Sequence, residues 1–598
     1  MSRHMSQPGV LVGLGSIILL AAAAVVLLVV RLLDLPGYDG SLNPFVVITA
    51  VATGTIIWTT SASVVLASLV AALIAVPAAI LWWRMYRGGP RRRSDAASRH
   101  MAGRSELKRF SARGVAASAK KLRPGLESKE SDEHGVFVAY RVPDGMKLFQ
   151  SWEDMAVDIW GPRKGKTTAR AIPAAVAAPG PLLVTSRKGD IVDATRGPRE
   201  EKGRVWVFDP MAMLDQEQAF WWNPLAPISS VTDARRLAAA FTFSGDGTRD
   251  EYFASKSDDL VANFILAAAV GGKTLVDVFA WTTRPRDDEP AQLLESAGYI
   301  DPARAVRGAI GLPDKTRGGV YGGAEKAMAI LTETATSAWI TPTSGVPQFD
   351  PEAFVSSTDT LYLLSEDGPG APAPLVAAFV DSIYRAGEVA ARRSPGRRLN
   401  PPLLSVLDEA ANICKIKNLP NLYSFYGSAG MPIITILQSF VQGVGVWGRE
   451  GMQALWSAAN IRVLGGGVSD AEFLENQSKL IGEFDEATHS HSSSTGSSSR
   501  STSMRRRRIL EPSDLTALPD GRVVVLPSGA RPVLARTRAW WDSPWAEAIE
   551  RSQQKWDPLG TSTPSDSWDN GQHENSHAAS VDRAWEANLA ATKGSAIR

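Results

Sequence analysis

The chain has 598 residues, a formal net charge of +2 and 44% hydrophobic residues. This length allows several domains, and the composition is that of a folded protein rather than a disordered one. Because Cys414 is the single cysteine, the sequence also excludes an intrachain disulfide and a zinc site made of cysteines.

Apolar residues are concentrated at the start of the chain. No Asp, Glu, Lys or Arg occurs between Arg3 and Arg31, and none between Asp39 and Arg84. Because about 20 apolar residues cross a bilayer core, we expect a transmembrane anchor over 1–89 with two spans, at about 10–33 and 62–83. The apolar stretch 44–58 leaves a third, short span open.

Basic residues follow the second predicted span directly. The segment from Arg84 to Arg123 has thirteen Lys and Arg against only Asp95 and Glu106. Basic residues in this position keep the following segment in the cytoplasm. Residues 90–150 are therefore predicted to be a basic juxtamembrane linker and domain entry. Contact with anionic lipid headgroups and contact with a nucleic-acid backbone are both open for it.

A glycine-rich turn lies between a predicted strand at 155–160 and an alanine-rich predicted helix that reaches Ala178. Such a turn directs backbone N–H groups and a helix N-terminus at an anion. We expect Lys166 to reach the β- and γ-phosphates and the Thr167 hydroxyl to bind Mg²⁺. The predicted ATP-binding residues are Gly161, Pro162, Arg163, Lys164, Gly165, Lys166, Thr167 and Thr168. The two glycines enclose one residue fewer than in the usual phosphate-binding loop.

A second motif is the apolar run 403–407, which is predicted to be a buried central strand and ends at Asp408 and Glu409. In P-loop NTPases the acidic residue at such a strand end holds Mg²⁺, here Asp408. Glu409 then lies where a general base can polarise the attacking water. The alternative is an acidic first turn of a helix. The order of the two motifs favours an ATPase core.

The rest of the chain alternates predicted strands and helices, a pattern typical of a mostly parallel sheet covered on both faces. The interval 231–347 has helical periodicity and reads as an all-α insertion. A terminal hairpin is expected at 522–526 and 532–536. His489 and His491 lie in a serine-rich tract, so we expect them to be solvated rather than metal-bound. Further strands are expected at 182–185, 205–208, 360–364, 433–437 and 461–464.

Taken in order, these motifs resemble the type IV coupling proteins, the TraG/TraD-like membrane ATPases of conjugation and type IV secretion. The resemblance extends over most of the chain, and the shared order of its motifs makes it specific. It is carried by the membrane anchor, the phosphate-binding loop and the segments 185–190, 207–210, 222–225, 407–410, 436–439, 510–515 and 518–522.

The resemblance implies an α/β fold. It consists of a RecA-like nucleotide-binding domain over 151–230 and 348–545 and an inserted all-α domain over 231–347. Residues 546–598 are polar and poor in apolar residues, so we expect a disordered C-terminal tail there. The resemblance also implies a homo-hexameric ring of multi-pass subunits in the bacterial inner membrane, with the ATPase domain in the cytoplasm. The implied cofactors are ATP and Mg²⁺. The implied partners are a relaxase or relaxosome DNA, components of the secretion channel and membrane lipids.

Lys166, Glu409 and Gln438 are the implied catalytic residues, with the Gln438 amide contacting the γ-phosphate or the lytic water. Relatives commonly have an arginine in the region that matches 426–430, which here contains none. Any arginine that acts on a neighbouring subunit must therefore come from elsewhere in the chain. Arg462 and Arg187 are named for this role as a guess, without a supporting motif.

The expected function is that of a membrane-anchored ATPase, which couples a relaxase–DNA complex or a protein to a secretion channel and drives its transfer. Three alternatives stay open. The first is an FtsK-like double-stranded DNA pump, and the second is a secretion ATPase that carries only proteins. The third is a nucleotide-binding substrate receptor with little hydrolysis.

Overall fold

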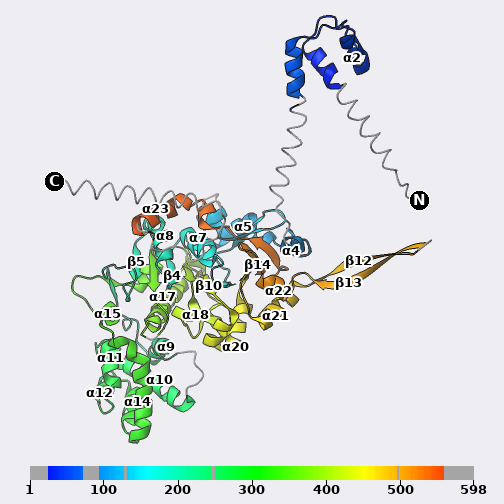
Figure 1. The fold of residues 1–598 in the computed structure, drawn as a ribbon. Coiled ribbons are helices and arrows are strands. Elements are labelled where there is room, and N and C mark those ends of the chain that lie inside the picture. The colour runs from blue at the N-terminus through cyan, green and yellow to red at the C-terminus, as the bar shows by residue number, and fades with distance from the viewer. Residues whose placement is uncertain are drawn as a thin grey trace, which may run out of the picture. The chain divides into compact units, whose positions relative to one another are not determined.

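A computed structural model describes residues 24–69, 71, 93–126, 131–243, 250–368, 370–494, 497–557 and 560. The chain divides into two compact units, Met1–Arg92 and Arg93–Arg598, and each is described by itself (Figure 1).

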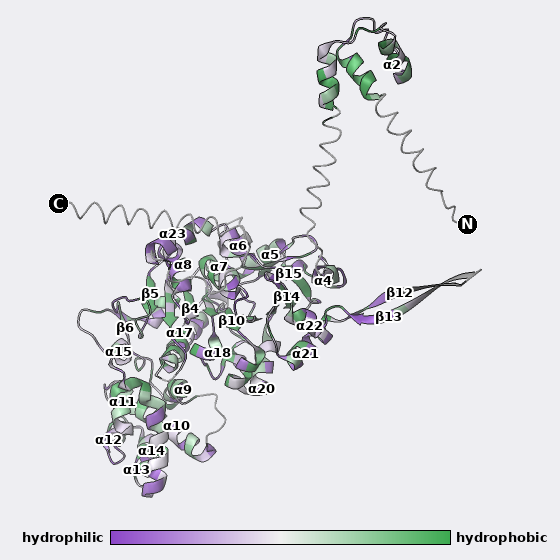
Figure 2. Ribbon diagram, viewed as in Figure 1, coloured by the Kyte–Doolittle hydropathy of each residue, from purple (hydrophilic) through white to green (hydrophobic). Residues whose placement is uncertain are grey.

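The N-terminal unit consists of helices at 24–32 and 60–69 and of α2 (Pro44–Ala52), which is strongly hydrophobic in Figure 2. Val29, Val30, Val47 and Ile56 are buried in its small core. None of the helices described here is long and apolar enough to cross a membrane. Most of the predicted spans 10–33 and 62–83 lies outside the described residues.

The second unit is built on an 11-stranded sheet. Seven of its strands are parallel, namely β11, β3, β10, β9, β4, β8 and β5, and β14, β15, β1 and β2 continue the sheet in antiparallel pairing. The predicted α/β class is confirmed, and every predicted strand is present. In spatial order the strands are β2 (Lys147–Gln150), β1 (Val136–Arg141), β15 (Val533–Arg536), β14 (Arg522–Pro527), β11 (Ile461–Gly465), β3 (Ala156–Ile159), β10 (Ile433–Leu437), β9 (Leu404–Leu407), β4 (Leu182–Ser186), β8 (Thr360–Leu364) and β5 (Val205–Phe208).

Both faces of the central strands are buried, which explains why these strands read as continuous apolar runs. In β4, Leu183 enters one hydrophobic core while Leu182 and Val184 enter the other. The first core contains α17 (Ala373–Arg393), and the second contains α7 (Ile172–Ala177) and α8 (Asp190–Glu200). The other helices near the sheet are α4 (Arg93–Ala97), α5 (Ala112–Leu122), α6 (Ser131–His134), α16 (Pro351–Val355), α18 (Ala410–Ile413), α19 (Leu419–Leu422) and α20 (Phe440–Ala458).

The interval between β5 and β8 is mainly helical. Its longest helix, α10, buries Leu260, Phe264 and Ile265 among the helices around it. In Figure 1 these helices (green) gather at one end of the unit. They are α9 (Val231–Thr242), α10 (Glu251–Val270), α11 (Leu275–Thr282), α12 (Glu289–Ser296), α13 (Ile300–Ile310), α14 (Asp314–Met328) and α15 (Thr334–Ser337), and the short pair β6 (Trp221–Trp222) and β7 (Gln348–Phe349) flanks the interval.

The serine- and arginine-rich tract forms part of a two-stranded ribbon that projects from the unit (Figure 1). The ribbon, β12 (Glu483–Ser494) and β13 (Ser497–Arg508), lies between α21 (Ala471–Ile481) and α22 (Pro512–Thr516). Its base is hydrophilic (Figure 2), with Glu483 opposite Arg508 in the strand register. The side chains of His489 and His491 are outside the described part. Within the described residues, no group of three or more His, Cys, Asp and Glu side chains could hold a metal ion.

The expected disordered tail begins with a helix, α23 (Ala546–Trp556), so the prediction of disorder is wrong for these residues. The Ile549 side chain is fully buried, and the Ser552 hydroxyl donates to Asp193 O at 2.6 Å and accepts from Gly197 N–H at 2.9 Å. A few contacts to α8 therefore order a segment of low hydrophobicity. Residues 558–559 and 561–598 lie outside the described part.

Candidate nucleotide-binding site

Three neighbouring strands bring the predicted site residues together. The loop 161–168 follows β3, Asp408 and Glu409 follow β9, and Gln438 follows β10, which lies between β3 and β9 in the sheet. Because these strands are parallel, the three segments meet at the carboxyl ends of the strands, where open α/β sheets bind ligands.

The loop after β3 is a tight turn. Arg163 and Gly165 both have positive φ, 56° and 80°. Trp160 N–H still donates to Leu437 O in the sheet at 3.1 Å, and Gly161 N–H donates to Gly466 O at 3.0 Å. The part of the loop that can surround an anion therefore begins at Arg163, because Pro162 has no N–H group.

This geometry explains the unusual glycine spacing. Counted back from Lys166, the usual motif places its first glycine at position 160, where this chain has Trp160. Gly161 is instead required one position later, because a Cβ there would lie 2.5 Å from the Gly467 carbonyl carbon. The first glycine of the loop therefore serves close packing against Gly467.

Two groups for binding a phosphate and a magnesium ion lie at the end of this loop. The Lys166 side chain belongs to a residue only 6% exposed, and its ammonium has no hydrogen-bond or ion-pair partner among the described residues. Since a nearly buried cation without a partner is costly, the position fits a phosphate group. The Thr167 hydroxyl donates to Asp408 Oδ2 at 3.4 Å. A hydroxyl and a carboxylate at this separation suit Mg²⁺, which prefers oxygen ligands.

Glu409 adopts a left-handed backbone conformation, with φ of 52°. Its Oε1 accepts a hydrogen bond from Gln438 Nε2 at 3.0 Å. Arg187 Nη1 lies 3.7 Å from Glu409 Oε2. Arg462, by contrast, is on β11 and donates to Leu526 O at 3.3 Å.

A C-terminal segment supports the loop in a way that the sequence did not predict. Lys164 Nζ lies 2.7 Å from Asp520 Oδ1, and Gly467 N–H donates to Thr516 O at 3.0 Å. A Cβ on Gly466 would lie 2.4 Å from Leu518 O. Three successive glycines, 465–467, were the only sequence signal of this close packing.

A buried ion pair fastens the helix that follows the loop. Arg170 Nε donates to Asp158 Oδ2 on β3 at 2.7 Å, and Arg170 Nη2 donates to Gln150 Oε1 at 2.7 Å. Burial raises the pKa of the Asp158 carboxyl, and Arg170 opposes this shift. Residues 167–171 form a π-helical turn. Pro173 has no N–H group for the regular helix bond at this point.

Two other residues singled out by the sequence have no place in this site. The Cys414 thiol is fully buried, and burial raises its pKa far above the usual range. Tyr426, in the segment 426–430 where the family resemblance led us to expect an arginine, is buried and donates to Glu388 Oε1 at 2.6 Å.

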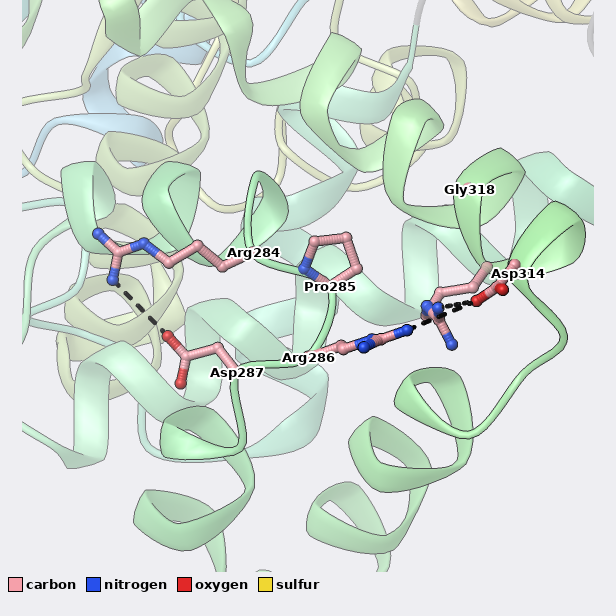
Figure 3. A pocket seen from close by; sticks show the side chains of 7 residues that line it. Arg284, Pro285, Arg286, Asp287, Asp314 and Gly318 are labelled. Atoms are coloured by element: carbon pink, nitrogen blue, oxygen red, sulfur yellow. Dashed lines mark hydrogen bonds and ion pairs between the residues drawn. The ribbon is translucent and has the colours of Figure 1, made fainter.

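A separate open hollow lies in the helical interval, between the loop after α11 and the start of α14 (Figure 3). Its arginines are already paired with carboxylates. Arg284 Nη1 lies 3.7 Å from Asp287 Oδ2, and Arg286 and Arg317 both contact Asp314. Because these arginines are neutralised by carboxylates, the site at the carboxyl ends of β3, β9 and β10 is the better candidate for binding a nucleotide.

Comparison with known proteins agrees with this geometry. Residues 402–520 match the family described as "TraM recognition site of TraD and TraG", a segment that contains Asp408, Glu409, Gln438 and Asp520. No curated protein sequence matches the chain significantly.

Among solved structures, the fold is similar to that of the bacterial conjugative coupling protein TrwBdeltaN70 in its unbound form. The TM-score is 0.50 at 17% identity, over 67% of this chain and 88% of that one. The plasmid coupling protein TrwB in complex with ADP and Mg²⁺ gives the same TM-score and identity, 0.50 and 17%, over 67% of this chain and 90% of that one. The chain therefore has a segment that matches this family, on a fold similar to that of the coupling protein TrwB.

Proposed function

We propose that this chain is a membrane-anchored ATPase that couples a relaxase–DNA complex or a protein to a type IV secretion or conjugation channel and drives its transfer by ATP hydrolysis. The observation that carries the proposal is the meeting of the loop 161–168, Asp408–Glu409 and Gln438 at adjacent ends of β3, β9 and β10. The similarity to coupling proteins supports the same function.

In this proposal each residue has a distinct role. Lys166 and the loop N–H groups bind the β- and γ-phosphates, and Thr167 and Asp408 hold Mg²⁺, which neutralises charge on the phosphates when bound. Glu409 accepts the proton of the attacking water. Gln438 contacts the γ-phosphate or that water. A solved structure of TrwB is described as a complex with ADP and Mg²⁺, which supports these cofactors.

We also propose the domain organisation that the sequence predicts. The anchor is 1–89, the linker 90–150 and the nucleotide-binding domain 151–230 with 348–545. The inserted domain is 231–347. The anchor holds a homo-hexamer at the inner membrane with the site in the cytoplasm, and the inserted domain contacts the cargo. A neighbouring subunit would supply any arginine that the site lacks.

One observation favours a second candidate, a nucleotide-binding receptor with little hydrolysis. Both Glu409 carboxylate oxygens accept a hydrogen bond from a protein amide. A base held in this way needs a rearrangement before it can take a proton. The receptor would bind ATP and cargo without turnover.

The proposal is tested by comparing wild type with Lys166→Ala. ATP binding and Mg²⁺-dependent ATP turnover, with and without DNA, are measured on the full-length chain in lipid nanodiscs, and cargo transfer is measured in cells. We expect turnover and cargo transfer in wild type and neither in Lys166→Ala, because the variant lacks a charge-assisted contact to the phosphates. Wild type that binds ATP and transfers cargo without turnover would support the receptor. Normal transfer by Lys166→Ala would reject both functions.

A further inference from the structure

Four residues form a closed ring of hydrogen bonds that begins and ends at the Glu409 carboxylate. Asn412 Nδ2 donates to Glu409 Oε2 at 3.1 Å, and Gln442 Nε2 donates to Asn412 Oδ1 at 2.6 Å. The backbone N–H of Gln438 donates to Gln442 Oε1 at 3.1 Å. The Gln438 side chain then closes the ring at Glu409 Oε1, at 3.0 Å.

The ring allows each amide only one orientation. An ionised carboxylate only accepts hydrogen bonds, so Asn412 must present its NH₂ group to Glu409 and its oxygen to Gln442. Gln442 must then donate to Asn412 with its NH₂ group and accept the Gln438 N–H with its oxygen. The arrangement is therefore fixed by the chemistry of the groups.

Local backbone structure brings the members together. Glu409 turns the chain through a left-handed conformation, and Asn412 N–H donates to Glu409 O at 2.8 Å in the short helix α18. Gln442 is in the first turn of α20, where its own N–H donates to the Ser439 hydroxyl at 3.1 Å. Gln442 thus has its backbone N–H and both side-chain polar groups engaged, which makes it a fixed support for Asn412.

The strongest hydrogen bonds of the ring are the two that the Glu409 carboxylate accepts. The Glu409 side chain is 15% exposed, and hydrogen bonds to a charged group are stronger than those between neutral groups. The two amide donors act on different oxygens, so together they fix the plane of the carboxylate. Arg187, at 3.7 Å and 43% exposed, is a weaker constraint.

We propose that Asn412, held by Gln442, is the positioning residue of Glu409 in hydrolysis, and that Gln438 is the member of the ring that is released. The inference rests on the proposed function. When the Gln438 amide contacts the γ-phosphate of bound ATP, it leaves Glu409 Oε1, while Asn412 keeps Oε2 in place. Oε1 is then open to the attacking water.

In the hydrolysis step that follows, the water oxygen bonds to the γ-phosphorus, and the bond from that phosphorus to the oxygen of the departing ADP breaks. One water proton passes to Glu409 Oε1, and the products are ADP and phosphate. In this proposal Asn412 contacts Glu409, Gln442 contacts Asn412, and both act only through Glu409.

The test uses Asn412→Ala and Gln442→Ala in the full-length chain. We expect kcat to fall about 10- to 100-fold in each, because a shift of about 1 Å in a reacting group can cost 10²-fold. The KM for ATP and the affinity for a fluorescent ATP analogue should stay within twofold of wild type. The matched control is Asn421→Ala, which removes an exposed amide bonded to Asn418 Oδ1 at 2.5 Å and should leave kcat unchanged.

The decisive comparison is made in a Glu409→Gln background. If Asn412 acts through Glu409, then adding Asn412→Ala to Glu409→Gln lowers kcat no further. With Glu409 intact, the double variant Asn412→Ala with Gln442→Ala should have the same kcat as either single variant. A role confined to packing α18 against α20 predicts the opposite, since that loss does not depend on Glu409. Thermal unfolding midpoints identify a variant that fails to fold, and in that case Asn412→Ser replaces Asn412→Ala.

The outcomes separate this inference from the proposed function. If Glu409→Gln or Lys166→Ala hydrolyses ATP like wild type, the proposed function fails. If both are impaired but Asn412→Ala has the wild-type kcat, only the positioning role of Asn412 is overturned. A further fall of kcat when Asn412→Ala is added to Glu409→Gln also overturns it.

Discussion

A methyl group added at Gly466 tests whether the C-terminal segment supports the phosphate-binding loop. The Cβ of Gly466→Ala would lie 2.4 Å from Leu518 O and 3.3 Å from the Leu518 carbonyl carbon. Both are backbone atoms, so the clash cannot be relieved by a side-chain rotation. Because Gly466 O accepts the Gly161 N–H at 3.0 Å, any shift of Gly466 moves the start of the loop.

The size of the effect follows from this geometry. Excess volume in a well-packed site costs about 1–3 kcal/mol. If most of this strain opposes the nucleotide-bound loop, the affinity for Mg²⁺·ADP falls by about tenfold for each 1.4 kcal/mol. We therefore expect a Kd that is about 5- to 150-fold above that of wild type.

The assay is equilibrium binding of a fluorescent ADP to the full-length chain in the presence of Mg²⁺. The matched control is Gly308→Ala in α13, where an added Cβ meets no atom within 4 Å. This control should bind normally and be stabilised by about 0.5–1 kcal/mol, because alanine is the better helix former. Binding by Gly466→Ala within twofold of wild type would refute the coupling between segment 516–520 and the loop.

Two further predictions concern a buried ion pair and a lysine whose ammonium lies against backbone carbonyls. Arg170→Met should lower the free energy of unfolding by about 3–5 kcal/mol because it leaves Asp158 buried without its cation, and adding Asp158→Asn should recover part of this loss in urea unfolding. A double variant as unstable as Arg170→Met would contradict the ion pair. Burial lowers the pKa of Lys202 from 10.5 to about 8, so between these values the unfolded chain binds more protons and stability rises with pH. Lys202→Met should reduce this rise between pH 8 and 10, and an unchanged pH dependence of its unfolding midpoint would exclude Lys202 as the cause.

The parallel part of the sheet was predictable because its strands are buried on both faces. The run 403–407, for example, reads as a continuous apolar strand that ends in two carboxylates. The order of the motifs then placed the loop after β3 and the carboxylates after β9. Chemistry that depends on a strand end and the residue that follows it could thus be derived from the sequence.

Contacts between distant segments could not be derived in this way. Lys164 and Asp520 are separated by 356 positions, and an exposed lysine and aspartate give no signal of pairing. The contact of Asn412 with Glu409 depends on a left-handed backbone at a non-glycine residue, which local propensity disfavours. The strands β1 and β2 at the sheet edge were missed, as was α23, whose order depends on packing against α8.

The central claim, that Glu409 drives ATP hydrolysis at this sheet edge, is tested most directly by one comparison. ATP binding and Mg²⁺-dependent turnover are measured in parallel for wild type and Glu409→Gln in the full-length chain. We predict that Glu409→Gln binds ATP like wild type and hydrolyses it about 10²–10⁴-fold more slowly, which is the usual loss for a positioned base. Turnover of Glu409→Gln within a factor of two of wild type would contradict the account.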